Sequence, residues 1–306
     1  MVALRHFLSL RDRTASEYRA LFERSHELKR RRRAGQRDAT LVGRTLVLLM
    51  EKASTRTRLS FAAAIGQLGG HAVELAASTS QLARGEPIGD TARVVSGYAD
   101  AVVFRTSADA RLAEYTAASG IPVINGLSDG GHPVQVLTDL FTVEEALGSV
   151  AGRTVAFIGD CAGNMARSFL EAAPIFGFSL RLGAPEAFRP PPELVKAAGG
   201  RVAVVSDPAE AVRGAEVVST DVWTSMGQEA EAEARRTALR GYTVDEALLA
   251  AALPGAIVLH CLPAHRGEEI TEAVMLGPGS RIWDEAENRM HVQKALLEQL
   301  ILGRDA

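Results

Sequence analysis

The chain has 306 residues, of which 47% are hydrophobic and 23% are charged, and its 34 basic and 37 acidic side chains give a formal net charge of -3. This length exceeds that of a usual single domain, and the composition is typical of a folded protein, not of a disordered one. The near-neutral charge excludes a general polycation for nucleic acid, and no apolar run approaches the roughly 20 residues that a membrane span requires. We therefore expect two globular domains, with neither nucleic acid nor membrane as a partner.

Short apolar runs alternate with helical stretches along the chain, which is typical of parallel α/β sheets. The candidate strands are Thr45–Met50, Ala101–Phe104, Ile121–Ile124, Thr154–Ile158, Val202–Val205, Val217–Thr220 and Ala256–Leu259. These runs lack a period-two alternation, so we expect central strands that are covered on both faces. The prediction is an α/β fold of two domains, each a mainly parallel sheet flanked by helices.

Bridging helices are expected to join the two domains. The stretch from Pro133 to Leu147 is apolar at helical spacing, begins with a proline suited to a first helical turn and ends before Gly148. A C-terminal helix is expected from Ala286 to Leu300. We place the first domain at residues 1–147, completed by residues 286–306, and the second domain at residues 148–285.

The segment at residues 51–58, EKASTRTR, follows a predicted strand and precedes a helical stretch. Ser54, Thr55 and Thr57 supply hydroxyls, the first helical amides are unpaired within the helix, and Arg56 adds a planar double donor. An ordinary capped helix with surface arginines is the alternative. Because three hydroxyls and two arginines within five residues exceed what a cap requires, we favour a phosphate site.

Two further positions of the first half lie where strands end or helices begin. Arg105 follows the predicted strand Ala101–Phe104, and His132 and Gln135 lie three residues apart at the start of the bridging helix. Taken singly, each could be a structural side chain. Ligands of open α/β sheets gather outside the carboxyl ends of the strands, so we treat all three as candidates for one site.

Polar segments also follow the strands of the second half, at residues 159–165, 221–227 and 260–263. The first of them lacks the G-x-G-x-x-G spacing of a dinucleotide site. In the second, Asp221 and Ser225 lie four residues apart and suit the ammonium of an amino acid.

The third of these segments raises the question of a metal or of a cysteine nucleophile. His260, Cys261 and His265 do not have a usual zinc spacing. His260 and Cys261 are expected to point to opposite faces of a strand, which makes them a poor nucleophilic pair. Cys161 and Cys261 are the only cysteines, and this sparse use favours a reducing cytoplasm.

Five motifs together resemble the aspartate/ornithine carbamoyltransferase family in their order and spacing, and they span most of the chain. They are STRTR at 54–58, HPVQ at 132–135, DVWTSMG at 221–227, HCLP at 260–263 and EAENR at 285–289. The resemblance implies transfer of the carbamoyl group of carbamoyl phosphate to the side-chain amine of L-ornithine, giving L-citrulline and phosphate. It also implies a role in arginine biosynthesis, no cofactor, no metal, and a homotrimer or an assembly of trimers.

The resemblance assigns the site residues in three sets. Carbamoyl phosphate binding is implied for Ser54, Thr55, Arg56, Thr57, Gln81, Arg105, His132, Gln135, Cys261, Leu262 and Arg289. Ornithine binding is implied for Asn164, Asp221, Ser225 and Met226. Arg105, His132 and Cys261 are expected to be catalytic. One position departs from the family pattern, because Gly163 stands where the family commonly has asparagine.

Other functions remain open at this point. The acceptor could be putrescine, an acylated ornithine or aspartate, although Ser225-Met226-Gly227 resembles the ornithine pattern best. A dehydrogenase that uses NAD is disfavoured by the missing glycine fingerprint. A noncatalytic phosphometabolite-binding protein would be expected to lack catalytic residues, and none is missing.

Overall fold

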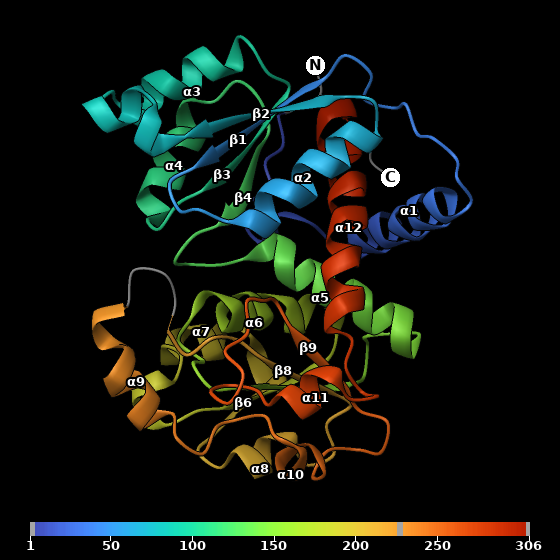
Figure 1. The fold of residues 1–306 in the computed structure, drawn as a ribbon, viewed down its shortest axis with the longest axis vertical. Helices are drawn as coiled ribbons and strands as arrows, with labels where there is room; N and C mark the ends of the chain where they lie inside the picture. Colours follow the sequence, from blue (N-terminus) through green and yellow to red (C-terminus); the bar gives the residue numbers. More distant parts are fainter. Residues whose placement is uncertain (1–3, 225–228, 304–306) are drawn as a thin grey trace. The chain divides into compact units, whose positions relative to one another are not determined.

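The computed structural model describes residues 4–224 and 229–303, and the chain divides into two compact units. The first unit comprises Met1–Leu137 and Asn288–Ala306, and the second comprises Thr138–Glu287. The boundaries fall inside α5 (Pro133–Leu147) and α12 (Ile282–Leu302), so these helices connect the units (Figure 1). Among the described residues, no helix is both long and apolar enough to cross a membrane.

In the described part of the first unit, four parallel strands form one sheet with the order β2-β1-β3-β4. The strands are β1 (Thr45–Met50), β2 (His71–Ala76), β3 (Ala101–Arg105) and β4 (Val123–Leu127). The helices are α1 (Ala15–Arg33), α2 (Thr55–Gln67), α3 (Ile88–Ser96) and α4 (Asp109–Ala118), with short 3-10 helices η1 (Leu10–Asp12), η2 (Ala77–Thr79) and η3 (Gln81–Arg84).

Helices cover both faces of this first sheet. Val47 and Leu49 of β1 and Phe104 of β3 pack with Ile88 of α3 and Tyr115 of α4 in one buried cluster. Because side chains alternate along a strand, the other buried residues of β1 face the opposite side of the sheet. Figure 1 shows α2 on that opposite side. Burial on both faces explains why β1 is a continuous apolar run.

The second unit also has a parallel sheet, and its described strands follow the order β7-β6-β5-β8-β9. The strands are β5 (Thr154–Ile158), β6 (Ser179–Gly183), β7 (Val202–Val205), β8 (Val217–Thr220) and β9 (Ile257–His260). The helices are α6 (Asn164–Phe176), α7 (Pro192–Ala197), α8 (Pro208–Val212), α9 (Ala232–Ala238), α10 (Glu246–Leu249) and α11 (Glu272–Leu276), with 3-10 helices η4 (Glu186–Phe188), η5 (Gly199–Arg201) and η6 (Glu229–Glu231).

The core of the second unit joins the sheet to the helices on one face. Ile158 of β5, Val218 of β8 and Val258 of β9 pack with Val212 of α8 and Met275 of α11. On α6, Phe169 contacts Phe157 of β5, with ring centroids 5.8 Å apart. These contacts hold the central strands β5 and β8 rigidly, so the loops that follow them start from fixed positions.

The α/β fold with two parallel sheets is confirmed, and several details differ from the prediction. Strands β2 and β6 were not predicted, because both carry polar residues and neither is a continuous apolar run. The expected coverage on both faces is wrong for β7, which lies at the edge of its sheet with Ala203 exposed. The strand predicted at Ile121–Ile124 instead spans Val123–Leu127, so it includes polar Asn125.

Candidate functional site

The strand order of the first unit places two of the predicted segments side by side. The chain runs from β1 outward to β2 and then returns to β3 on the other side of β1, so the order reverses between β1 and β3. Ligands of open parallel sheets bind outside the carboxyl ends of the strands at such a reversal. Residues 51–57 follow β1 and Arg105 ends β3, and Glu51 N donates to Arg105 O at 2.9 Å.

The N-terminus of α2 is built from the predicted hydroxyl residues. Ser54 is the N-cap, and its Oγ accepts from Thr57 N at 3.3 Å. Thr55 and Arg56 occupy the first turn, whose amides have no partner within a helix and favour an anion. Thr57 is fully buried, and its Oγ1 accepts from Arg289 Nη2 at 2.7 Å. Arg289 on α12 is thereby fixed beside this helix end.

His132 lies among positive charges immediately before α5. It is 5% exposed, and Gln135 in the first turn of α5 is 2% exposed. Burial lowers the pKa of His132 well below its usual value, and the charges of Arg289 and then Arg105 lower it further. The imidazole is therefore neutral near pH 7 and can donate one hydrogen bond without carrying a charge. The arrangement suits a bound anion with a polarised carbonyl group.

Gln81 lies apart from these contacts within the described residues. It opens η3 after the edge strand β2, and its side chain is exposed. Its Oε1 accepts from Arg84 Nη1 at 3.4 Å, instead of joining Ser54, Thr57 or Arg289. Gln81 therefore forms no hydrogen bond with the other candidate residues of the first unit, within the part of the chain that the structure describes.

The sheet of the second unit reverses its order between β5 and β8. Asn164 opens α6 after β5, and Asp221 follows β8 directly, so both lie at this reversal. Gly159 follows β5 directly with φ +113°, and a Cβ there would lie 3.3 Å from Trp223 Nε1. The turn after β5 therefore requires glycine, because the conformation is left-handed and the indole ring is close.

An ion pair connects the loops after β5 and β8. The carboxylate of Asp160 accepts from Arg235 on α9, and Arg235 Nε donates to Trp223 O at 2.5 Å. The guanidinium also lies 4.9 Å from the ring centroid of Phe188. Arg235 therefore holds the two loops that carry Asn164 and Asp221 at fixed positions.

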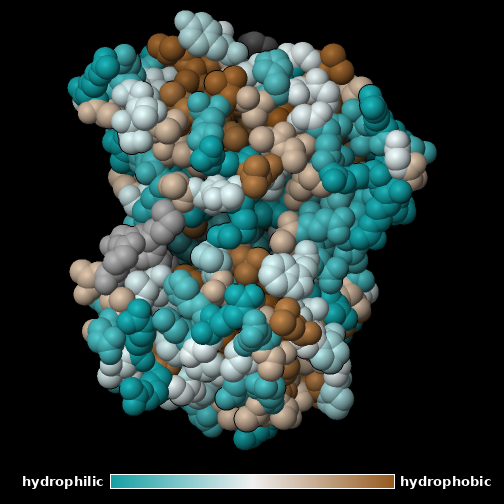
Figure 2. Space-filling model, viewed as in Figure 1, coloured by the Kyte–Doolittle hydropathy of each residue, from teal (hydrophilic) through white to brown (hydrophobic). Residues whose placement is uncertain are grey.

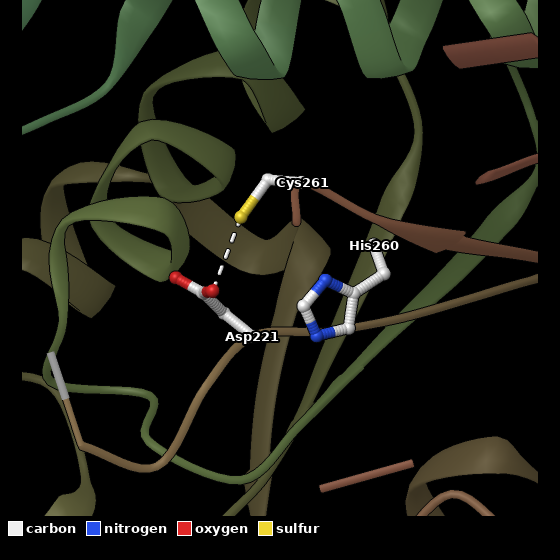
Figure 3. A group of neighbouring side chains, drawn as sticks. All are labelled: Asp221, His260 and Cys261. Atoms are coloured by element: carbon white, nitrogen blue, oxygen red, sulfur yellow. Dashed lines mark hydrogen bonds between the residues drawn. The ribbon is translucent and has the colours of Figure 1, made fainter. Parts of the chain in front are cut away.

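Cys261 and Asp221 meet at the carboxyl ends of β9 and β8, as Figure 3 shows. The thiol donates to Asp221 Oδ1 at 3.1 Å, and Val222 N donates to the same oxygen at 2.8 Å. Desolvation and then the Asp221 charge raise the pKa of the Cys261 thiol well above its usual value. Desolvation also raises the pKa of Asp221. Cys261 is therefore a protonated donor and not a thiolate nucleophile.

The expectation that His260 and Cys261 point to opposite faces is wrong. Ligand atoms of Asp221, His260 and Cys261 lie within 4.8 Å of one another. The strand alternation does not apply, because β9 ends at His260 and the chain turns at Leu262, whose φ is +58°. The spacing would suit a metal ion, but each of the three groups already takes part in a hydrogen bond, and the thiol keeps its proton.

Two of the predicted ornithine residues, Ser225 and Met226, lie outside the described residues. Two buried carboxylates that hold His260 were not among the predicted site residues: Glu269 faces its Nε2, and Glu285, the first residue of the EAENR motif, accepts from its backbone N–H at 2.9 Å. Glu268 and Glu269 are adjacent acids in a polar stretch. The sequence gives no signal that separates the buried one from its partly exposed neighbour.

Two family models together match almost the whole chain. Residues 5–145 match the carbamoyl-P binding domain of aspartate/ornithine carbamoyltransferase. Residues 151–300 match the Asp/Orn binding domain of the same family. The division between the two matches falls within and just after α5, where one of the two connections between the compact units also lies.

Several relatives are similar to this chain over nearly their full lengths. The ornithine carbamoyltransferase of Sorangium cellulosum is 54% identical, with 98% of each chain covered. The anabolic ornithine carbamoyltransferase of Pseudomonas aeruginosa is 53% identical, again over 98% of each. The solved ornithine carbamoyltransferase of Pyrococcus furiosus has a TM-score of 0.92 at 42% identity, covering 99% of this chain and 98% of that one. Its folded units, its motif residues and these similarities establish that the chain belongs to the aspartate/ornithine carbamoyltransferase family.

Proposed function

We propose that the chain transfers the carbamoyl group of carbamoyl phosphate to the side-chain amine of L-ornithine, giving L-citrulline and phosphate. The observation that carries the proposal is the helix end at Ser54–Thr57, fixed to Arg289 beside a neutral His132, in a chain 54% identical to a named ornithine carbamoyltransferase. The anabolic relative supports a role in arginine biosynthesis.

The carbamoyl-phosphate domain in this proposal comprises residues 1–147 with residues 286–306, and the ornithine domain comprises residues 148–285. Carbamoyl phosphate is bound by Ser54, Thr55, Arg56, Thr57, Gln81, Arg105, His132, Gln135, Cys261, Leu262 and Arg289. Ornithine is bound by Asn164, Asp221, Ser225 and Met226. The positions of Asn164 and Asp221 at the strand-order reversal support the second set.

The reaction forms a C–N bond and breaks the C–O bond to phosphate. The neutral amine of ornithine attacks the carbamoyl carbon and gives up a proton to the departing phosphate, while negative charge develops transiently on the carbonyl oxygen. Arg105, His132 and Thr57 donate to that oxygen. Arg56 and the first amides of α2 stabilise the departing phosphate, and Gln135 holds the carbamoyl NH2 group. Catalysis depends on orientation and charge, and Cys261 orients the carbamoyl group as a protonated thiol.

A homotrimer, or an assembly of trimers, completes the proposal. Edge strand β2 and helix α3 expose Val73 and Val94, at 48% and 53%, and Figure 2 shows hydrophobic side chains gathered over this region. An open strand edge with apolar side chains favours association. We expect light scattering to give the mass of three 32.5-kDa chains, or a multiple of it, and a monomer mass would contradict this.

A cytoplasmic location is part of the same proposal. Cys161 and Cys261 are both free thiols in the structure. Free thiols of this kind are usual in reducing compartments.

The choice of acceptor tests the function directly. We expect citrulline and phosphate to form in equal amounts from carbamoyl phosphate and L-ornithine. Putrescine lacks the α-carboxylate and aspartate lacks the side-chain amine, so both should react far more slowly under the same conditions. Colorimetric assay of the carbamoylated product with each acceptor decides the question. Faster reaction with putrescine or aspartate would reassign the substrate.

Replacing Arg56 tests the phosphate site. Arg56→Ala should weaken carbamoyl phosphate binding by about 1.5–3 kcal/mol, because one charge-assisted hydrogen bond is lost. Arg58→Ala is the matched control, since Arg58 Nη2 on the same helix pairs with Glu74 at 2.6 Å. Titration calorimetry should show a weaker Kd for the first variant only, and equal affinities would remove Arg56 from the site.

Replacing Asp221 tests the ornithine site. Asp221→Asn should raise the KM for ornithine roughly tenfold or more, since a charged hydrogen bond to an ammonium group contributes about 1.5–3 kcal/mol. The KM for carbamoyl phosphate should change much less. Steady-state kinetics with each substrate varied in turn, beside a thermal melt, separate this result from misfolding. Parallel increases in both KM values would argue against a specific contact.

The pH dependence of His132 follows from its lowered pKa. The folded protein keeps the ring neutral as the pH falls from 8 to 6, whereas the unfolded chain takes up a proton near pH 6.5. Stability linked to this residue is therefore present above pH 6.5 and is lost as the pH falls below it. NMR of ring-labelled histidine, assigned with His132→Gln, should show no titration of His132 between pH 8 and 6. A midpoint near 6.5 would contradict the burial argument.

A further inference from the structure

Glu269 is a buried carboxylate that the reaction proposed above does not use. It lies in the loop between β9 and α11 and is 0% exposed. Its Oε1 lies 3.1 Å from His260 Nε2 and accepts from His265 N at 2.6 Å. His260 is itself 1% exposed, so this contact is shielded from water. An ionisable pair shielded in this way needs a specific reason to persist.

The surroundings of His260 fix which ring nitrogen carries the proton. Leu262 N donates to His260 Nδ1 at 2.9 Å, so Nδ1 must be an acceptor without a proton. The neutral ring then carries its proton on Nε2, which faces the carboxylate of Glu269. Without an acceptor at Nε2, the ring is free to adopt the other tautomer, and Nδ1–H would then oppose the backbone N–H of Leu262.

The hydrogen bond to Nδ1 acts on a strained backbone. Leu262 has a φ of +58°, in the left-handed region that a leucine rarely adopts. Leu262 N donates to His260 Nδ1 at 2.9 Å, and the neighbouring thiol of Cys261 donates to Asp221 Oδ1 at 3.1 Å. Together these two bonds orient the peptide unit between Cys261 and Leu262. The ring tautomer of His260 therefore affects the two residues that are proposed to orient the carbamoyl group.

The second oxygen of Glu269 argues against a purely structural role. Within the described residues, Oε2 is buried and has no hydrogen-bond partner. Burial of a polar atom without a partner is unfavourable, and glutamine or an apolar residue would fill the same space at a lower cost. A strong acceptor facing His260 Nε2 explains why the carboxylate is nevertheless present.

We infer that Glu269 is a positioning residue for carbamoyl transfer: it holds His260 in the Nε2–H tautomer, and His260 in turn holds Leu262 in its left-handed conformation. This inference rests on the proposed function. The carboxylate touches neither substrate and acts on the site through the imidazole, while its bond from His265 N holds the loop. The residues that bind the phosphate group in the first unit are not involved.

Replacing the carboxylate with an isosteric apolar group tests the inference. Glu269→Met should lower kcat roughly ten- to hundredfold, because the orienting peptide is displaced. The Kd for carbamoyl phosphate, measured by calorimetry, should change less than about twofold, since most of its contacts are elsewhere. Glu268→Met is the matched control: Glu268 is adjacent, partly exposed and paired with Arg236 at 3.0 Å, and its loss should leave kcat unchanged. Equal kcat values for both variants would overturn the inference.

The activity of a conservative variant and the tautomer of His260 distinguish a positioning role from a general loss of structure. Glu269→Gln keeps an acceptor at Oε1 and should restore most of the lost kcat, whereas a loss equal to that of methionine would contradict the hydrogen-bond argument. Nitrogen NMR should show Nε2–H on His260 in the native protein and in Glu269→Gln, and a mixed or reversed tautomer in Glu269→Met. An unchanged tautomer in Glu269→Met would also overturn the inference.

A second pair of variants covers the case in which Glu269→Met does not fold. His260→Asn keeps an acceptor near the position of Nδ1, while His260→Gln places its amide near Nε2. We expect the asparagine variant to be roughly tenfold more active, and equal activities would overturn the inference. If the native protein forms no citrulline, the proposed function itself fails and the catalytic role of Glu269 fails with it. The tautomer measurement then still decides whether Glu269 holds His260.

Discussion

Parallel strand pairing is the constraint on which the candidate site depends. In a parallel sheet, the connection after each strand must return to the side of the sheet where the strands begin. The carboxyl ends of all the strands therefore lie on the same side. The strand order reverses next to β1 and next to β5, so the connections on either side run in opposite directions, and open parallel sheets bind ligands at such a reversal. Ser54 and Arg105 lie at the first reversal, and Asn164 and Asp221 lie at the second.

The charged groups at the carboxyl ends of the strands differ in sign between the two units. In the first, burial lowers the pKa of His132, and the charges of Arg289 and then Arg105 lower it further, so the ring stays neutral. In the second, desolvation raises the pKa of both Asp221 and Cys261, so the thiol keeps its proton. The first environment suits a substrate with a multiply charged phosphate. The second holds the carboxylate of Asp221, which suits the ammonium group of an amino acid.

Continuous patterns in the sequence predicted most of the fold, and contacts between distant segments account for what was missed. Thr154–Ile158 and Pro133–Leu147 were predicted with the bounds that the structure has, because one is an unbroken apolar run and the other has regular helical spacing. β6 was not predicted, because Arg181 interrupts its apolar residues.

For the candidate site, the phosphate-type segment at Ser54–Thr57 was predicted from local chemistry alone, since the hydroxyls and the helix start are contiguous. The bond between Thr57 and Arg289 joins residues 232 positions apart, and resemblance alone suggested that Arg289 belongs to the site. For Glu269, neither the neighbouring residues nor the family resemblance indicated a role in the site. Nine residues separate it from His260, and only the turn of the chain after β9 brings the carboxylate to the ring.

The hydrogen bond from Cys261 to Asp221 also has a consequence for oxidation. Peroxides attack the thiolate form of cysteine, so the susceptibility of a thiol follows its fraction of thiolate as well as its exposure. Cys261 is partly exposed, but desolvation and the neighbouring carboxylate keep it protonated. The residue is therefore protected from sulfenic acid formation by its electrostatic surroundings, and oxidants of this kind should leave the site intact at concentrations that modify ordinary surface cysteines.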